Sequence, residues 1–358
     1  MKMKKTIAVC MAAAMLIVSM AACGTKPAAP AAPAAPAAPA APAAPAEPVS
    51  KYADWPEKNI NYIITAKAGG GLDLCARILA PYWEASVDNE ATVTVNNVTG
   101  GANWIGWTEM MNAKPDGYTV SNIHTPQCYS YLNKSLGSSA NLDSFNLLCN
   151  YVTDSVTIAV RADDDRFANV NDLKQLAEYL KANASTTFNV SLTSQGGADQ
   201  IAMLEFASLA GITNMLGVNH SEGIAAQKAA FLGGDCDIVF GKVGDTLPLL
   251  NDGAAKILAV CKAERSTYMP DIPTAKEQGF DIALGSDRGI VCQPGMDEEL
   301  KARIVDTLRT ACENPEFLAK MADGGYEVNW MEGEAYEAHM KNMENLIIKY
   351  SDALGYNG

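Results

Sequence analysis

The repeated order of short apolar strand, glycine turn and helix limits this chain more than any other feature. Ile60–Thr65 is rich in residues that favour strands, and Leu72–Ala85, behind a glycine turn, has apolar residues at helical spacing. The same order returns in a second series that begins near Val170. Strands that alternate with helices pair in parallel, so the sequence predicts the α/β fold class, as two modules with a cleft between them.

Each module has its own expected elements. We expect helices at Leu72–Ala85, Trp104–Met111, Val170–Leu180, Ala198–Ala210 and Ala225–Leu232, and strands at Ile60–Thr65, Ala91–Val95, Tyr118–Ile123, Tyr151–Val160, Phe188–Leu192, Met215–Val218, Cys236–Phe240 and Ile257–Val260. Tyr151–Val160 leads into the second module and Ile257–Val260 could return to the first, so that two crossing strands form a hinge. We expect one domain at residues 52–155 and 262–358, and the other at residues 156–261.

The first 22 residues have the pattern of a secretory signal peptide. Lysines near the N-terminus precede an apolar run at residues 7–18, and small residues follow this run. The run is shorter than the ~20 residues that a bilayer-spanning helix needs. Cys23 and Gly24 then resemble a bacterial lipoprotein box, so we expect Cys23 to carry a lipid that anchors the protein to a membrane. The alternative is an ordinary signal peptide with an incidental cysteine.

Residues 23–51 are expected to link this anchor to the folded part. Pro27–Pro48 consists almost wholly of Ala-Ala-Pro repeats. Such a segment buries no core and favours extended polyproline II, which gives a stalk of roughly 70 Å at ~3.1 Å per residue. The expected location is therefore extracytoplasmic, tethered to a bacterial cell membrane.

The charge balance excludes one class of partner. The formal net charge is −14 and no basic run compensates it. A protein of this kind repels phosphate backbones, so no nucleic acid is expected as a partner.

The cysteines and histidines give no framework for disulfides or metals. Seven of the nine cysteines lie beyond Cys23, an odd number without close pairs, and the chain has three histidines. Neither residue type occurs at metal-ligand spacing. We expect no metal and no cofactor, and we expect most of the cysteines to act as small buried hydrophobic residues.

The glycine turn behind the first strand is the most informative segment. It contains Lys67, Gly69, Gly70 and Gly71, and Asp73 follows in the first turn of the expected helix. A strand that ends in glycines before a helix exposes backbone N–H groups at the positive helix end, where a carboxylate or phosphate binds well. The alternative is plain turn chemistry. The spacing matches neither a Walker loop nor a dinucleotide fingerprint.

The sequence gives no signature of an enzyme. It contains neither a Gly-x-Ser-x-Gly elbow nor a His-Glu-x-x-His motif. Asp73 and His124 both follow expected strands and could meet in one cleft. That leaves a hydrolytic enzyme as the alternative to a binding protein, which we expect to be non-catalytic.

A set of short motifs resembles the tricarboxylate-binding, Bug-type extracytoplasmic solute receptors of tripartite tricarboxylate transporters. The motifs occur in order along most of the chain, and they are Trp55-Pro56-Glu57-Lys58, Gly69 to Asp73, Ala76-Arg77, Gly100 to Asn103, Pro115 to Thr119, Phe231 to Asp237, Leu258 to Val260, Pro270 to Thr274 and Pro294-Gly295. The resemblance implies a two-domain type II periplasmic-binding-protein fold, with hinge strands and an interdomain cleft that closes on a small organic anion.

The resemblance also implies where the ligand is held. One carboxylate is expected on the first glycine loop and on the loop behind the second strand, and further contacts come from a glycine turn in the other domain. The candidate ligand-binding residues are Ala66, Lys67, Gly69, Gly70, Gly71, Asp73, Gly101, Asn103, His124, Thr193, Ser194, Gly196, Gly197, His220 and Arg288. For the second-domain turn, the alternative is a simple helix cap.

Three positions depart from the family pattern. Ala66 stands where many relatives have an aromatic residue, and Gln200 lies near a usual histidine. Arg288 replaces a tryptophan-bearing pattern and could clamp a carboxylate, or it could pair with Asp287 or a hinge acid. His124 and His220 follow strands and face either the cleft or the interior.

The resemblance implies a transport role. The expected partners are a small di- or tricarboxylate or related carboxylate ligand, and the large and small membrane subunits of a tripartite transporter. A sensory binding protein that presents its ligand to a signalling kinase is the alternative, because the same fold and site serve both roles.

Overall fold

The computed structural model describes residues 50–87, 89–137, 140–220 and 222–357. The expected signal peptide, Cys23 and the Ala/Pro linker up to residue 49 lie outside the described residues. Residues 49–358 form one compact unit.

Each helix and strand expected from the sequence is present, and residues 243–251 and 285–349 hold further elements that the sequence analysis does not predict. The strands are β1 (Ile60–Ile64), β2 (Val93–Asn97), β3 (Thr119–His124), β4 (Asn146–Arg161), β5 (Phe188–Leu192), β6 (Met215–Asn219), β7 (Ile238–Lys242), β8 (Ala255–Val260), β9 (Gly285–Cys292) and β10 (Val328–Glu332). The helices are α1 (Gly71–Ala85), α2 (Trp104–Asn112), α3 (Leu173–Ala182), α4 (Ala198–Ala210), α5 (Ile224–Gly233), α6 (Val243–Asn251), α7 (Glu298–Glu313), α8 (Pro315–Asp323) and α9 (Gly333–Lys349).

Two groups of strands form the sheet. In the first group, which we call lobe 1, β1 pairs in parallel with β2 and β3, and β9 pairs with β3 in antiparallel fashion. In the second group, which we call lobe 2, β5 pairs in parallel with β6 and β7. The parallel pairs follow from the helices that connect their strands, because a parallel connection needs a crossover.

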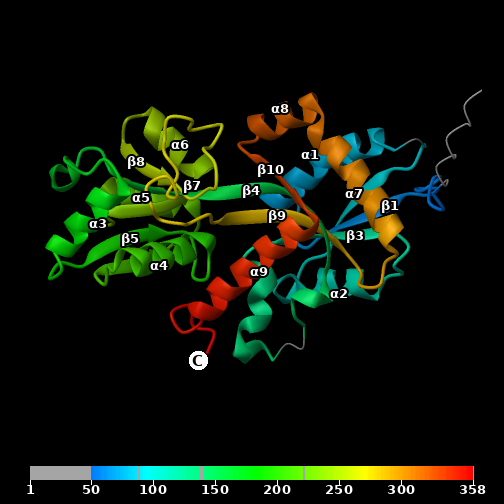
Figure 1. Ribbon diagram of the computed structural model, residues 1–358, viewed down its shortest axis with the longest axis horizontal. Helices are drawn as coiled ribbons and strands as arrows, with labels where there is room; N and C mark the ends of the chain where they lie inside the picture. The colour runs from blue at the N-terminus through cyan, green and yellow to red at the C-terminus, as the bar shows by residue number, and fades with distance from the viewer. Residues whose placement is uncertain (1–49, 88, 138–139, 221, 358) are drawn as a thin grey trace, which may run out of the picture. The chain divides into compact units, whose positions relative to one another are not determined.

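The long strand β4 belongs to both lobes (Figure 1). Its first part, Asn146–Ser155, pairs with β9 and β10, and its second part, Val156–Arg161, pairs with β7 and β8. The prediction that Ile257–Val260 returns to the first module is wrong, because this strand pairs with the lobe 2 part of β4. The chain returns instead through residues 261–284 and β9.

Three chain segments meet where the lobes join. Val156 donates its backbone N–H to Leu284 O at 2.9 Å and accepts the N–H of Cys261 at 2.7 Å. At this junction, backbone hydrogen bonds therefore link the segment at Val156 to the segments at Cys261 and Leu284. A junction made of a few extended residues is the geometry that allows hinge motion between lobes.

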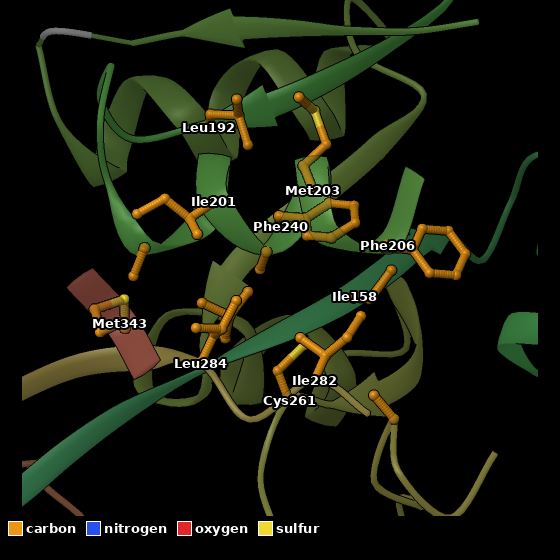
Figure 2. Packing of buried hydrophobic residues seen from close by; sticks show 14 of the residues in the cluster. Ile158, Leu192, Ile201, Met203, Phe206, Phe240, Cys261, Ile282, Leu284 and Met343 are labelled. Atoms are coloured by element: carbon orange, nitrogen blue, oxygen red, sulfur yellow. The ribbon is translucent and has the colours of Figure 1, made fainter. Parts of the chain in front are cut away.

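Apolar side chains from both lobes pack into continuous clusters. Figure 2 shows part of one cluster, in which Ile158 of β4 and Phe240 of β7 pack with Ile201 and Phe206 of α4, while Met343 arrives from α9. Each of these side chains is at most 2% exposed. Full burial of one such side chain contributes about 2 kcal/mol, so these contacts hold α4 firmly on its sheet.

All seven described cysteines are buried and free. Burial raises their pKa values; that of Cys75 reaches about 11, with Arg288 opposing the rise. None of the helices in the described parts of the chain combines the length and the apolar composition that a membrane span requires.

Candidate functional site

The first glycine loop connects β1 to α1 and has a defined backbone shape. Gly69 adopts a φ of +81°, which side chains disfavour, and its N–H donates to Asp73 Oδ2 at 2.8 Å. Gly70 caps α1, and its N–H donates to Lys67 O at 3.2 Å. The N–H groups of Gly71 and Leu72, in the first helical turn, have no acceptor among the described residues.

The carboxylate of Asp73 is buried below this loop and is neutralised by Arg77. Arg77 Nη2 lies 3.0 Å from Asp73 Oδ1, and Asn97 Nδ2 donates to the same oxygen at 2.9 Å. Burial raises the pKa of Asp73, but the bonds from Arg77, Gly69 and Asn97 outweigh it and leave the pKa below the usual range. The loop is therefore held in shape without excess negative charge, and its free N–H groups suit an anion.

The neighbouring lobe 1 residues leave polar groups open. Ala66 contributes its carbonyl oxygen to Asn97 Nδ2 at 3.0 Å. Lys67 is exposed, and its ammonium group has no partner among the described residues. Gly101 and Asn103 adopt φ of +55° and +80°, so the backbone turns tightly just before α2 begins. Asparagine tolerates this left-handed geometry.

Arg288 pairs with a hinge-strand acid rather than with Asp287. Its Nη2 lies 2.6 Å from Asp154 Oδ2, and its guanidinium lies 4.6 Å from the centre of the Tyr326 ring. Burial lowers the pKa of Arg288, but the Asp154 charge together with the interactions of Cys75 and Tyr151 outweighs burial and raises the pKa. The guanidinium also lies under the first glycine loop, because a Cβ added at Gly71 would be 3.4 Å from Nη2.

The two candidate histidines occupy different surroundings. His124 ends β3, pairs in register with Arg288, and packs against Trp107 with ring centres 5.6 Å apart. Burial and the Arg288 charge lower the pKa of His124 to about 4, so it is neutral at pH 7. His220 follows β6, and its Nε2 lies 4.0 Å from Cys236 Sγ.

The second-lobe turn between β5 and α4 uses its own donors internally. Thr193 donates its N–H and its hydroxyl to Asp199 Oδ2. Gly196 donates its N–H to Gln200 Oε1 at 2.6 Å, and Gly197 donates to Ser194 O at 3.2 Å. Gln200 therefore shapes this turn in the way that Asp73 shapes the first glycine loop.

One cavity joins the two lobes at these loops. It has a volume of about 110 Å³ and is lined by Ala102, Asn103, Pro126, Gln127, Ser130, Gln195, Gly196 and Tyr356. Asn103 and Gly196, predicted from the sequence as site residues on different lobes, thus share a cavity. Gly70 is not among the residues that line it.

Sequence reasoning missed three residues of this region. Asp154 lies in the middle of an apolar strand, and Asp199 directly precedes Gln200, which lies near the histidine position of the family pattern. Tyr356 reaches the cavity from the segment behind α9, where Lys134 donates its N–H to Tyr356 O at 3.0 Å and Gln195 Nε2 donates to Leu354 O at 3.2 Å. A long-range contact of this kind leaves no local sequence signal.

The described residues contain no cluster of three or more histidine, cysteine or acidic side chains positioned to hold a metal ion. What the two loops offer is backbone N–H groups, neutral amides and hydroxyls. This donor set suits the recognition of a small polar molecule or anion.

Comparisons with known proteins agree with this architecture. A curated relative from Cupriavidus necator, a UPF0065 protein in the gbd 5' region, is 26% identical over 289 residues, which are 79% of this chain and 83% of the relative. A TctC solute-binding protein from Polaromonas superposes with a TM-score of 0.74 at 24% identity and covers 82% of this chain and 99% of its own. MatC from Rhodopseudomonas palustris, solved with bound malate, has a TM-score of 0.58 at 20% identity over 84% of this chain and 100% of its own.

These structures confirm the predicted α/β, two-domain periplasmic-binding-protein fold. The model of the tripartite tricarboxylate transporter family receptor, TctC, matches residues 84–350, well over half of the chain. The chain therefore belongs to the TctC family of tripartite tricarboxylate transporter receptors.

Proposed function

We propose that this chain is an extracytoplasmic solute-binding lipoprotein that captures a small organic carboxylate and delivers it to the large and small membrane subunits of a tripartite tricarboxylate transporter. The observation that carries the proposal is the cavity that Asn103 of lobe 1 and Gly196 of lobe 2 share. The bound malate of MatC, a structural relative, supports the choice of a carboxylate. Family membership supports a receptor rather than an enzyme.

In this proposal the ligand carboxylate docks on lobe 1 first. The free N–H groups of Gly71 and Leu72 point out of the positive end of α1, and the Lys67 ammonium adds a mobile positive charge nearby. Arg288 lies below the same loop and holds the hinge acid Asp154. The other candidate residues then either line the ligand site or fix the shape of its loops.

Closure of the lobes is the proposed transport signal. We place the domain bounds at residues 155/156 and 261/262, and the backbone bonds of Val156 to Leu284 and Cys261 support this choice. Contacts from lobe 2 favour the closed form only when a ligand fills the gap, because a ligand shifts an equilibrium by its differential affinity. The membrane subunits then bind the closed form, and a lipid on Cys23 keeps the receptor at the membrane.

Thermal unfolding of the purified protein with a panel of mono-, di- and tricarboxylates tests the proposal. A ligand at about 1,000 times its Kd should stabilise the protein by about 4 kcal/mol. Uncharged analogues of the same size are the control. Absence of stabilisation by every carboxylate in the panel would contradict the proposed function.

Replacement of Cys23 by serine tests the anchor separately. The wild-type protein should partition into a detergent phase and the variant into the aqueous phase. Equal partition of both forms would remove the lipid from the proposal while leaving ligand capture in place.

A further inference from the structure

The glycine loops of the two lobes differ in their charge balance. On lobe 1, the buried Asp73 carboxylate is paired with Arg77, and the first-turn N–H groups of α1 stay open. On lobe 2, Gln200 takes the position that corresponds to Asp73, and the neighbouring Asp199 is the buried acid in the first turn of α4, where it is 1% exposed. Within the described parts of the chain, no lysine, arginine or histidine forms an ion pair with Asp199.

The lobe 2 carboxylate also has a free oxygen. Asp199 Oδ2 accepts from Thr193, whereas Asp199 Oδ1 is buried and has no hydrogen-bond partner among the described residues. This oxygen lies over Gly197, where any side chain would collide with it. Gly196 and Gly197 donate their N–H groups to Gln200 and Ser194, and the N–H groups of Ala198 and Asp199, at the start of α4, have no acceptor among the described residues. This turn therefore differs from that of lobe 1 in the unpaired carboxylate and not in its backbone donors. An incoming anion would meet an uncompensated negative charge here.

A second lobe 2 carboxylate, that of Asp245, interacts with Asp199 and with two lysines. Burial raises the pKa of Asp245, in the first turn of α6. The nearby ammonium groups of Lys242 and Lys228 oppose that rise, and the Asp154 and Asp199 carboxylates add to it.

The cavity between the lobes is lined by neutral groups. Its side chains include the amides of Asn103, Gln127 and Gln195 and the hydroxyls of Ser130 and Tyr356, and none of its lining residues is a lysine, an arginine, a histidine or an acid. The amides of Asn103 and Gln127 have no partner among the described residues. Neutral amides can bond an amide or hydroxyl of the ligand, but they offer a carboxylate no counter-charge, which becomes costly once closure of the lobes buries that group.

We propose that this cavity is the distal subsite of the ligand and that it takes an uncharged hydrogen-bonding group. The ligand then has one carboxylate, on the first glycine loop, and an amide or hydroxyl at its other end. This inference rests on the proposed function, and it separates this receptor from relatives that hold a dicarboxylate such as malate.

Matched ligand pairs test the subsite. Isothermal titration of the purified protein near neutral pH compares succinate with succinamate and glutarate with glutaramate, which differ only in carboxylate against amide. We expect the monoamides to bind at least about tenfold more tightly. Equal or tighter binding of the dicarboxylates overturns the inference and leaves the proposed function standing. Binding of no carboxylate overturns both. Tighter binding of 4-aminobutanoate than of succinamate also overturns the inference, because the subsite would then prefer a cationic group.

Two variants locate the preference in this cavity. Gln195 is exposed, so Gln195→Lys adds a cation at the lining with little effect on folding. It should reduce the preference for succinamate over succinate about tenfold. Asp199→Asn removes the buried charge and should shift the preference in the same direction. Asn251→Lys, at the exposed end of α6, makes the same charge change elsewhere and is the matched control. An unchanged preference in Gln195→Lys would overturn the assignment.

Discussion

Arg288 on β9 and Asp154 on β4 form an ion pair of 2.6 Å across the two strands that join in lobe 1, and both side chains are at most 14% exposed. The pair lies between the first glycine loop and the junction of the lobes. It therefore connects the element that is proposed to bind the ligand with the element that is proposed to move.

Asp154→Ala should lower the free energy of unfolding by about 3 kcal/mol, because it leaves the buried Arg288 cation without its counter-charge. Urea unfolding measures this change. Asp163→Ala removes the partner of Arg161 from a pair in which Asp163 is 75% exposed, and should leave the stability unchanged. Equal losses in both variants would show that burial does not govern the Asp154 pair.

Asp73→Asn should destabilise the protein by about 2 kcal/mol at neutral pH, because a charged acceptor for Arg77, Gly69 and Asn97 becomes neutral. The folded pKa of Asp73 lies below the unfolded value of 3.8. Its contribution is therefore complete above that value and is lost as the pH falls through the folded pKa. Urea midpoints of the two proteins should converge in strong acid. A gap that persists there would argue for a packing effect instead.

His339→Asn should cost more stability in mild acid than in mild base. His339 Nε2 lies 2.8 Å from Asp287 Oδ2. Burial lowers the pKa of His339, but Asp287 outweighs burial and raises it above the ordinary value of 6.5. The stabilisation is therefore complete below that value and declines as the pH rises through the folded pKa. Unfolding curves across this range measure the difference, and the neutral imidazole retains a residual bond. A pH-independent difference would contradict the assigned pair.

Gly197→Ala should destabilise the protein by about 2 kcal/mol and weaken any ligand-induced thermal shift. The backbone of Gly197 has ordinary angles, so the whole effect comes from the collision of the new methyl group with Asp199 and with Ser194 Oγ, 2.9 Å away. Gly233→Ala is the matched control, since its methyl group would meet nothing closer than 3.9 Å. A ligand-induced thermal shift in Gly197→Ala equal to that of the wild type would show that this turn does not contribute to ligand binding.

Most elements could be predicted because their signals are local. Ala198–Ala210 and Phe188–Leu192 were expected with the bounds that α4 and β5 have, since helical spacing and strand-forming residues lie within each segment. The prediction that Ile257–Val260 returns to the first module is wrong because strand pairing is not a local property. Its pairing with β4 in lobe 2 depends on residues about 100 positions away, and the apolar pattern of a strand does not say which neighbour it chooses.

The sequence by itself determined the α/β order, the glycine loops and the family resemblance, because strand-forming runs, helical spacing, turn residues and family motifs are all readable along the chain. The tertiary structure alone decided that Arg288 pairs with Asp154, that Asp199 has no ion-pair partner in the described part of the chain, and that Tyr356 completes a cavity with Asn103 and Gly196. These relations depend on which surfaces the folded chain brings within a few ångströms of each other. Charge compensation and cavity walls act through space, so residues far apart in the sequence set them together.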